Sequence, residues 1–240
     1  RILISLGLES ELAKRATLPD AVQVMNGRTG KRIVTLPLGE AATYRYSAPY
    51  WVLHRADLQG VLLGAAQAHP DIEVRLGTHC EDFVSHAHGV TAVLRKGTQR
   101  SHEPGLALIG ADGVWSNVRH RLHGRVTPQF SNRTAWRTTI DASLLPRGLI
   151  GRSVLLWLGA NAHLVVYPIK GGNKINIVAI VPDTWNRPGW SEPGDPQVIL
   201  AQFGAPQWAN IVRMLLGAAD EWKRWALFAV PPLPFYAQGN

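Results

Sequence analysis

Four β-rich stretches lie between Thr134 and Val181, and they constrain the fold more than any other feature of the sequence. Each is rich in β-branched, aromatic and other apolar residues, the composition typical of strands that pack on a half-buried surface. Their sequences are TAWRTTIDA, SVLLWLG, HLVVYPIKGG and NKINIVAIV. They predict a mostly antiparallel sheet, with the helical region around Asp195 to Leu216 covering one side of it.

The first half of the chain mixes helical and extended patterns. The opening residues, RILISLGLESELAKRA, place apolar positions at helical spacing and predict the end of a helix. The stretch AVQVMNGRTGKRIVTLPL has two alternating segments around Asn26-Gly27, which predicts a β-hairpin. The extended stretch YWVLHR then leads into DLQGVLLGAAQAH, whose apolar spacing predicts a helix from Asp57 to His69.

Short strands are expected to follow Pro70. The segments IEVRLG, CEDFVSHA, GVTAVLRKG and LALIGADG are separated by glycine-containing turns. The last is the most apolar, so we expect it to be buried in a parallel sheet. Because the sequence changes character after Gly124, we predict a mixed α/β (α+β) fold with one domain over residues 1–125 and a second over residues 126–240.

The composition is that of a globular protein. The 240 residues are 46% hydrophobic and 18% charged, which allows a sizeable core. The sequence contains neither an apolar run of roughly 20 residues that would cross a bilayer nor, at Arg1 to Leu8, the pattern of a secretory signal. Cys80 is the only cysteine, so no internal disulfide forms. We therefore expect a soluble, cytoplasmic protein without a membrane partner.

The charge balance is basic. The chain has 25 Lys and Arg residues against 17 Asp and Glu residues, a formal net charge of +8. Such an excess attracts nucleic acid, a membrane surface, or an anionic cofactor and substrate. The basic residues form only short clusters, such as Arg119, Arg121 and Arg125, and no long Lys/Arg block. We therefore expect no nucleic-acid partner.

The segment LALIGADGVWSNVRHRL, from Leu106 to Leu122, carries the clearest chemical signal. It reads as a strand, a turn through Asp112 and Gly113, and a helix. A carboxylate at the end of a sheet strand lies where open α/β sheets bind ligands, and Gly113 allows close approach of the backbone. We expect the unpaired amides of the new helix to favour phosphate or ribose oxygens. The alternative is a turn that needs Asp and Gly only for its geometry.

The sequence GADGVWSNVR, from Gly110 to Arg119, resembles the second cofactor motif of the class A flavoprotein monooxygenases, the salicylate and hydroxybenzoate hydroxylase family. The resemblance implies that Asp112, with Gly113, helps to hold the ribityl and pyrophosphate region of FAD. The resemblance also implies a hydroxylation reaction, in which FAD is reduced by NADH or NADPH and a hydroxyl group derived from O2 is transferred to an electron-rich aromatic ring.

Two further segments resemble cofactor-binding parts of the same family. HRADLQGVLL, from His54 to Leu63, is similar to a segment in which an arginine at a strand end reaches FAD, which implies that role for Arg55 and places Gln59 one helical turn further on. The alternative for Arg55 is a surface salt bridge. LGTHCEDF places Cys80 where the backbone of a family strand meets the adenine, and the thiol itself is not expected to be catalytic.

NAHLVVYPIKGG, followed by NIVAIV, resembles the strand pair of the substrate domain that covers the flavin ring in this family. His163 and Tyr167 are the candidate catalytic residues. They are an even number of residues apart, so a strand presents both on one face, where they could orient a phenolic or carboxylated ring or transfer a proton. The alternative is a histidine and a tyrosine packed in the sheet with their polar atoms satisfied.

The chain also departs from the family pattern. It contains no G-x-G, and its single Gly-Asp, Gly194-Asp195, stands in the loop SEPGDPQ without the rest of the later Gly-Asp motif. We therefore expect an internal fragment that binds FAD poorly when isolated.

These patterns together predict a flavoprotein oxidoreductase that acts on a small aromatic substrate. A homodimer is compatible with them. The pairs His86 with His88 and His120 with His123 lack further ligands at suitable spacing, so we expect no metal site. Two alternatives stay open, another FAD-dependent oxidoreductase reaction on the same scaffold and a non-catalytic basic binding module.

Overall fold

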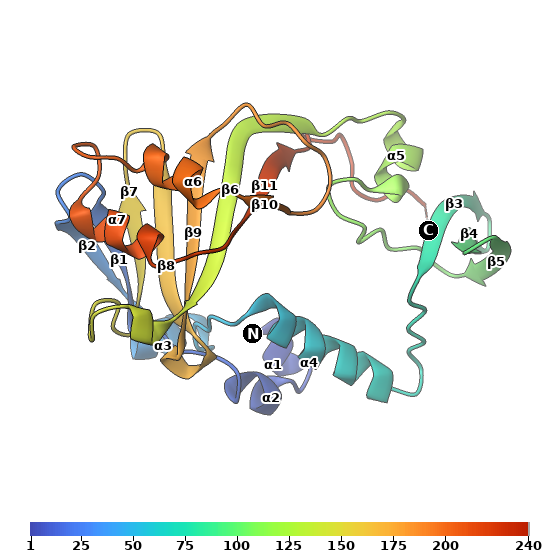
Figure 1. Cartoon of the computed structure of the whole chain (residues 1–240). Helices are drawn as coiled ribbons and strands as arrows, with labels where there is room; N and C mark the ends of the chain where they lie inside the picture. Colours follow the sequence, from blue (N-terminus) through green and yellow to red (C-terminus); the bar gives the residue numbers. More distant parts are fainter. Residues whose placement is uncertain (240) are drawn as a thin grey trace. The chain divides into compact units, whose positions relative to one another are not determined.

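The computed structural model describes residues 1–239, which form an eight-stranded sheet and a separate three-stranded sheet (Figure 1). The strands are β1 (Ala21–Asn26), β2 (Arg32–Pro37), β3 (Thr78–His86), β4 (Gly89–Lys96), β5 (Gln99–Gly105), β6 (Gln129–Asp141), β7 (Ser153–Leu158), β8 (His163–Ile169), β9 (Lys174–Pro182), β10 (Glu192–Gly194) and β11 (Trp222–Ala229). The α-helices are α1 (Ile2–Ser5), α2 (Glu9–Ala13), α3 (Gly39–Tyr46), α4 (Arg55–Ala68), α5 (Asn117–His123), α6 (Pro196–Gln202) and α7 (Asn210–Gly217). Two short 3-10 helices are η1 (Ala142–Leu144) and η2 (Lys170–Gly172). In this part of the chain, no helix has both the length and the apolar character needed to cross a membrane.

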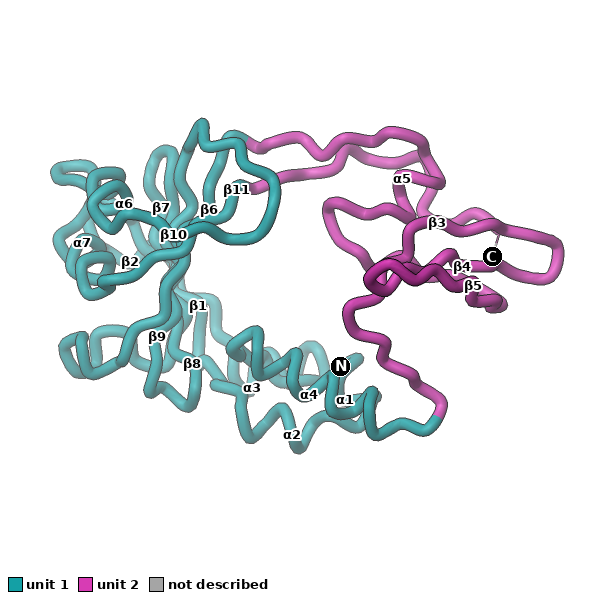
Figure 2. The backbone as a smooth tube through the Cα atoms, turned by 45° about the vertical axis from the view of Figure 1, so that its right-hand side comes forward, with its two compact units in different colours: residues 1–70, 132–226 teal, residues 71–131, 227–240 magenta. Residues whose placement is uncertain are grey.

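The chain divides into two compact units, coloured separately in Figure 2. The first unit comprises Arg1–Pro70 and Asn132–Ala226, and the second comprises Asp71–Ser131 and the residues from Leu227 onward. Both units are therefore built from two segments of the sequence. The proposed functional division into residues 1–125 and 126–240 follows different limits and stays a prediction.

The large sheet has the strand order β10-β11-β6-β9-β8-β7-β1-β2. The pairs β6/β9, β7/β8, β8/β9, β10/β11 and β1/β2 are antiparallel, and β1 runs parallel to β7. The four β-rich stretches form β6, β7, β8 and β9, so the prediction of a mostly antiparallel sheet is confirmed. The hairpin at Asn26-Gly27 is confirmed as well, and the Asn26 side chain closes its turn by accepting hydrogen bonds from the Arg28 and Thr29 amides at 3.0 and 2.9 Å.

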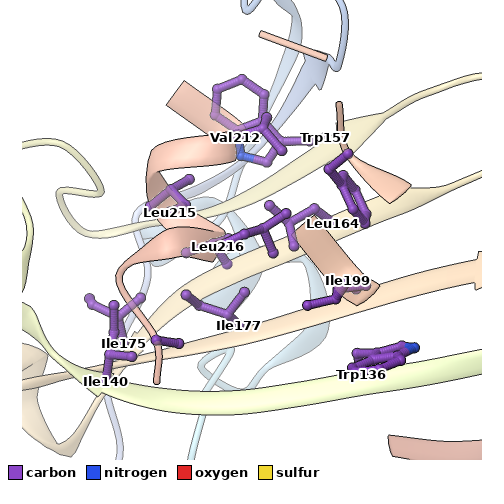
Figure 3. Packing of buried hydrophobic residues seen from close by; sticks show 14 of the residues in the cluster. Trp136, Ile140, Trp157, Leu164, Ile175, Ile177, Ile199, Val212, Leu215 and Leu216 are labelled. Carbon is purple, nitrogen blue, oxygen red and sulfur yellow. The ribbon is translucent and has the colours of Figure 1, made fainter. Parts of the chain in front are cut away.

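Helices α6 and α7 cover one face of the large sheet, as Figure 1 shows. Their buried residues are Ile199 in α6 and, at helical spacing, Val212, Leu215 and Leu216 in α7. Figure 3 shows these side chains meeting the buried residues of the strands, which include Trp136, Leu164 and Ile177. Burial of each such side chain contributes roughly 1.5–3 kcal/mol, so this layer is a main source of stability.

Two local features shape the start and the edge of this layer. Asp195 caps α6 by accepting a hydrogen bond from the Gln197 amide at 2.8 Å, and Pro196 occupies the first helical position. Gly194-Asp195 therefore has a clear structural role here. A Cβ atom on Gly27 would lie 2.4 Å from the Trp208 ring, so only glycine allows this hairpin to pack against the indole.

The second unit contains the antiparallel sheet β3-β4-β5, with α5 packed near β3. The segments CEDFVSHA and GVTAVLRKG form β3 and β4 as predicted, and β5 was not anticipated. The strand predicted for LALIGADG is wrong. Leu106 and Ile109 are 83% and 88% exposed, and neither lies in a strand. An apolar run becomes a buried strand only where neighbouring strands supply hydrogen bonds, and no strand within residues 1–239 pairs with this segment.

Three other predictions differ from the structure in detail. IEVRLG forms no strand. The opening residues form the two short helices α1 and α2, because Gly7, at a φ of 74°, separates them. The extended stretch before α4 pairs only through one bridge, between Val52 and Thr17. The helix predicted from Asp57 to His69 is confirmed as α4.

Replacing Leu216, a fully buried residue of α7, tests the importance of the covered face. We expect Leu216→Ala to lower the free energy of unfolding by about 2–5 kcal/mol, because it removes buried methyl groups and leaves a cavity. Urea unfolding followed by tryptophan fluorescence measures the change. Val198→Ala in α6 is the control, since Val198 is 47% exposed and its replacement should cost about 0.5 kcal/mol or less. Equal losses in the two variants would contradict the assignment of this core.

Candidate functional site

The opposite face of the large sheet lines a cavity of about 930 Å³ in the first unit. Side chains of β8 and β9 alternate between the two faces, so Leu164, Val166 and Ile177 are buried under the helices whereas Tyr167 and Asn176 line the cavity. The remaining walls come from the start of α4, from β6, from the loop that leads into β10, and from β11.

The strand register sets the positions of the polar groups on this face. Tyr167 pairs with Asn176, which pairs in turn with Thr139 of β6, so the three residues form one row across three strands. Val178 pairs with Arg137 in the adjacent row. The Arg137 guanidinium carbon lies 5.1 Å from the centroid of the Trp225 ring, a cation–π distance.

The two predicted catalytic residues occupy β8 as expected. Burial raises the pKa of the Tyr167 hydroxyl, Arg137 opposes this effect, and Tyr50 adds to it. Burial also lowers the pKa of His163, and the charge of Arg133 adds to that shift. His163 shares the face of Tyr167 by its even spacing, but of the two it is Tyr167 that lines the cavity. Their catalytic roles stay predictions.

Arg55 lines the same cavity as Tyr167, although the two residues are far apart in the sequence. It is the first residue of α4, whose N-cap His54 accepts a hydrogen bond from the Ala56 amide at 3.3 Å. The Arg55 guanidinium carbon lies 5.4 Å from the centroid of the Trp190 ring. Within residues 1–239 no carboxylate forms an ion pair with Arg55, so the salt-bridge alternative is not what the structure has. Gln59, one turn further along α4, is exposed.

Several residues of this cavity were missed by the sequence analysis. Arg137, Lys223, Trp190 and Trp225 all line it. Arg137 and Lys223, like Arg55, have no ion-pair partner among the described residues. Asp220 and Glu221 also line the cavity. Strand alternation in TAWRTTIDA could have placed Arg137 on the face opposite Trp136, but only the folded register shows that Trp225 lies beside it.

The second unit holds a separate cavity of about 430 Å³, lined in part by Asp112 and Gly113. The Asp112 carboxylate accepts hydrogen bonds from the amides of Asn117 and Val118 at 2.7 and 3.2 Å. Ser116 caps the Arg119 amide at 2.9 Å. The expectation of unpaired amides at the start of α5 is therefore wrong, because side chains of the preceding turn already satisfy them.

These hydrogen bonds determine the charge state of Asp112. Burial by itself would raise the pKa of this carboxyl group, but the hydrogen bond with Ser116 and those from the backbone amides outweigh burial and lower the pKa. Asp112 is thus a carboxylate at neutral pH, an acceptor for hydroxyl groups. Gly113 has a φ of 78°, in the left-handed region, and open space lies where its Cβ would be.

Arg119 is a further polar group of this cavity that the sequence analysis did not select. Its guanidinium donates to the carbonyl of Gly113 at 3.2 Å and to that of Val114, whereas its Nε is buried without a hydrogen-bond partner among the described residues. A buried donor of this kind is costly unless a ligand or water accepts from it.

Cys80 lies close to the same turn. Its carbonyl accepts a hydrogen bond from the Asn117 side chain at 3.5 Å, and its thiol donates to the Asp82 carbonyl at 3.5 Å. Burial raises the pKa of the thiol, and the charges of Asp112 and Asp82 add to the effect. The thiol is therefore protonated at neutral pH, and the predicted contact of the Cys80 backbone with the adenine stays a prediction.

Comparison with known proteins identifies the family. The profile of a family described as an FAD binding domain matches residues 1–223. The chain belongs to the FAD-binding domain family. This membership confirms the predicted family, whereas the roles of Arg55 and Asp112 stay predictions.

The named relatives of this chain are hydroxylases and monooxygenases. It is 31% identical over 238 residues to 3-hydroxybenzoate 6-hydroxylase 1 of Aquipseudomonas alcaligenes, covering 99% of this chain and 59% of the relative. It is 36% identical over 229 residues to a 3-amino-4-hydroxybenzoate 2-monooxygenase of Streptomyces platensis, covering 95% and 56%. A salicylate hydroxylase substrate complex superimposes with a TM-score of 0.78 at 25% identity, covering 99% of this chain and 60% of that structure. The chain thus spans less than two thirds of each relative, and the resemblance to this group of flavoprotein hydroxylases is confirmed.

The donor and acceptor groups described above fit FAD chemically. A carboxylate at Asp112 accepts from ribityl or ribose hydroxyls, and the guanidinium of Arg55 suits a phosphate or a polar ring edge. The buried Arg119 Nε and the open space at Gly113 are further features that a bound ligand would use. In residues 1–239, by comparison, no group of three or more His, Cys, Asp or Glu side chains is arranged to hold a metal ion.

Replacing Asp112 tests its role in ordering the start of α5. We expect Asp112→Ala to abolish the protection of the Asn117 and Val118 amides from hydrogen exchange at neutral pH, because both amides lose their acceptor. In the unchanged chain this protection should fall as the solution is acidified. A carboxyl group whose pKa is lowered in the folded state stabilises above its unfolded pKa, and that stabilisation is lost as pH falls through the folded value.

Hydrogen exchange measured by NMR at neutral pH and at about pH 3 gives both results. Glu40→Ala is the control, since Glu40 lies exposed in the first turn of α3, where no side chain caps the helix. Unchanged protection of the two amides in Asp112→Ala would rule out the capping role.

Proposed function

We propose that this chain serves an FAD-dependent monooxygenase that hydroxylates a small aromatic substrate, with NADH or NADPH as reductant and O2 as oxidant. The observation that carries the proposal is the convergence of Arg55 and Tyr167 on one cavity of the first unit, in a chain of the FAD-binding family. Its named relatives act on hydroxybenzoates, which directs the proposal to an aromatic carboxylate of that type.

The composition of the cavity supports an anionic aromatic substrate. Its volume of about 930 Å³ lies within the range of roughly 300–1,000 Å³ found for small-molecule sites. Arg137 offers a guanidinium that forms no ion pair with any carboxylate in residues 1–239, and a carboxylate ligand would form a charge-assisted, bidentate pair with it. Trp225 supplies an aromatic wall beside this group.

Tyr167 and Asn176 line the cavity, and we assign them to the phenolic end of the substrate. Because the pKa of Tyr167 is raised, its hydroxyl stays protonated at neutral pH and can donate a hydrogen bond to a phenolic oxygen. We keep His163, on the same strand face as Tyr167, as the candidate proton acceptor, because its lowered pKa leaves the imidazole neutral. A more electron-rich ring results when the phenol loses its proton, which favours hydroxylation.

FAD, when bound, supplies the redox chemistry that links the nicotinamide, oxygen and the aromatic ring. Within the first unit, we assign a role in FAD binding to Arg55 and Gln59. For the second unit, considered by itself, we assign such a role to Asp112, Gly113 and the Cys80 backbone. In this assignment Arg55 and the Gln59 amide donate hydrogen bonds, Asp112 accepts them, and Gly113 leaves room for the ligand.

A chimaera tests the enzymatic function directly. The chain replaces the matched 238 residues of 3-hydroxybenzoate 6-hydroxylase 1, and the purified protein is mixed with FAD, NADH and 3-hydroxybenzoate. We expect retained flavin, NADH consumption and a hydroxylated product identified by mass spectrometry. NADH consumption without a hydroxylated product would favour another FAD-dependent reaction on this scaffold. A chimaera that folds, as judged by circular dichroism, but retains no flavin would contradict the proposal.

Arg137 offers a test of the substrate class with the chain as it stands. We expect 3-hydroxybenzoate to bind, and Arg137→Gln to weaken this binding roughly 10- to 100-fold, because a charge-assisted hydrogen bond contributes about 1.5–3 kcal/mol. Isothermal titration calorimetry measures the affinity. Binding of 3-hydroxybenzamide, which lacks the carboxylate, should change little in the same variant.

Arg152→Gln is the control for that titration, since Arg152 is exposed, lies outside the described cavity lining and contacts Asp20 at 3.4 Å. Equal weakening of the carboxylate and the amide ligand by Arg137→Gln would show that Arg137 does not recognise the carboxylate.

A further inference from the structure

An ion pair links the two segments that bring Arg55 and Tyr167 into one cavity. The ammonium group of Lys170 lies 2.5 Å from Oδ1 of Asp57, across 113 residues of sequence. The Asp57 side chain is only 17% exposed, whereas that of Lys170 is 47% exposed. The second carboxylate oxygen, Oδ2, is buried and has no hydrogen-bond partner in the described part of the chain. Lys170 therefore supplies the positive charge that stabilises this largely buried carboxylate.

The pair lies beside both cavity residues in the sequence. Asp57 follows Arg55 by two residues in the first turn of α4. Lys170 follows Tyr167 by three residues, at the point where β8 ends and η2 begins. A second anchor precedes Arg55, because Val52 and Thr17 exchange backbone hydrogen bonds at 2.9 and 3.0 Å. Arg55 is thus held between a backbone bridge on one side and the ion pair on the other.

The backbone of Lys170 is itself unusual. Its φ is 54°, in the left-handed region, and Gly171 and Gly172 follow at 67° and 94°. The two glycines adopt such angles freely, but a lysine there is strained by roughly 1 kcal/mol or more. A strained residue persists where its surroundings over-determine it. The ion pair with Asp57 is an interaction of the Lys170 side chain that can stabilise this backbone conformation.

We infer that the Asp57–Lys170 ion pair is a positioning device that holds the start of α4 against the end of β8, so that Arg55 and Tyr167 act in one cavity. Asp57 and Lys170 are positioning residues, since neither is among the residues that line the cavity. The inference rests on the proposed function for its consequence in ligand binding, and on the structure alone for its geometry.

Removal of either charge should release α4 without unfolding the sheet. Asp57→Asn and Lys170→Met each break the pair, and we expect each to weaken 3-hydroxybenzoate binding roughly 2- to 30-fold, the range for coupling between neighbouring elements. The double variant should be no worse than the poorer single variant, because the two residues act as one unit. Lys170→Arg keeps the charge and should restore binding.

A nuclear magnetic resonance signal reports the position of Arg55 independently of any ligand. Arg55 lies over the Trp190 ring, so the resonance of its Nε–H is displaced by the ring current, and its disappearance in Arg55→Lys assigns it. In Asp57→Asn and Lys170→Met this resonance should move to the position of a free arginine, and in Lys170→Arg it should return. Circular dichroism and urea unfolding confirm that each variant is folded.

Asp141→Asn is the matched control, since the pair between Asp141 and Lys174 joins β6 to β9 at 2.9 Å and the Asp141 side chain is 58% exposed. It should leave the Arg55 resonance and the ligand affinity unchanged. An Arg55 resonance that stays in place in folded Asp57→Asn and Lys170→Met would overturn the inference. Failure of the unchanged chain to bind 3-hydroxybenzoate would instead count against the proposed function, while the resonance would still decide the role of the pair.

Discussion

The alternation of side chains across the central strands of the large sheet is the constraint on which the rest of the structure depends. In β9, Ile175 and Ile177 are buried beneath the helices, whereas Asn176 and Val178 line the cavity on the other face. A shift of one residue in the pairing would exchange these two sets and place polar groups in the core. The burial that stabilises the sheet therefore also positions Tyr167 and Asn176, so stability and site geometry arise from one set of contacts.

Basic residues are used differently at the surface and in the cavity. Surface arginines such as Arg75 and Arg95 have carboxylate partners, at exposed positions where such pairs contribute little to stability. In the cavity, Arg55 and Arg137 lie over tryptophan rings without an ion-pair partner in residues 1–239. Guanidinium groups without a carboxylate partner from the protein are available to bind an anionic aromatic ligand. Part of the excess of basic residues is thus explained by the arginines that line the cavity.

Local patterns predicted the elements whose stability is mostly local or repeated along the chain. The Asn26-Gly27 turn predicted the β1–β2 hairpin, and helical spacing predicted α4. The apolar segment at Leu106 was wrongly predicted as a strand, because strand formation depends on partners that the segment itself does not encode. The resemblance selected Arg55 and Asp112, but it could not reveal that Asp112 already binds the first amides of α5. Arg137 and Trp225 were missed because they meet only through the strand order of the folded sheet.

The central claim is that the cavity on the open face of the sheet binds an aromatic carboxylate between Arg137 and Tyr167. The most direct measurement is an NMR experiment that detects nuclear Overhauser effects from the ring protons of 3-hydroxybenzoate to assigned side chains of the chain. The account predicts effects to the Trp225 and Tyr167 rings, which line the same cavity. Effects confined to Phe83 and Leu122 of the second unit would contradict it, because they would place the ligand in the other cavity.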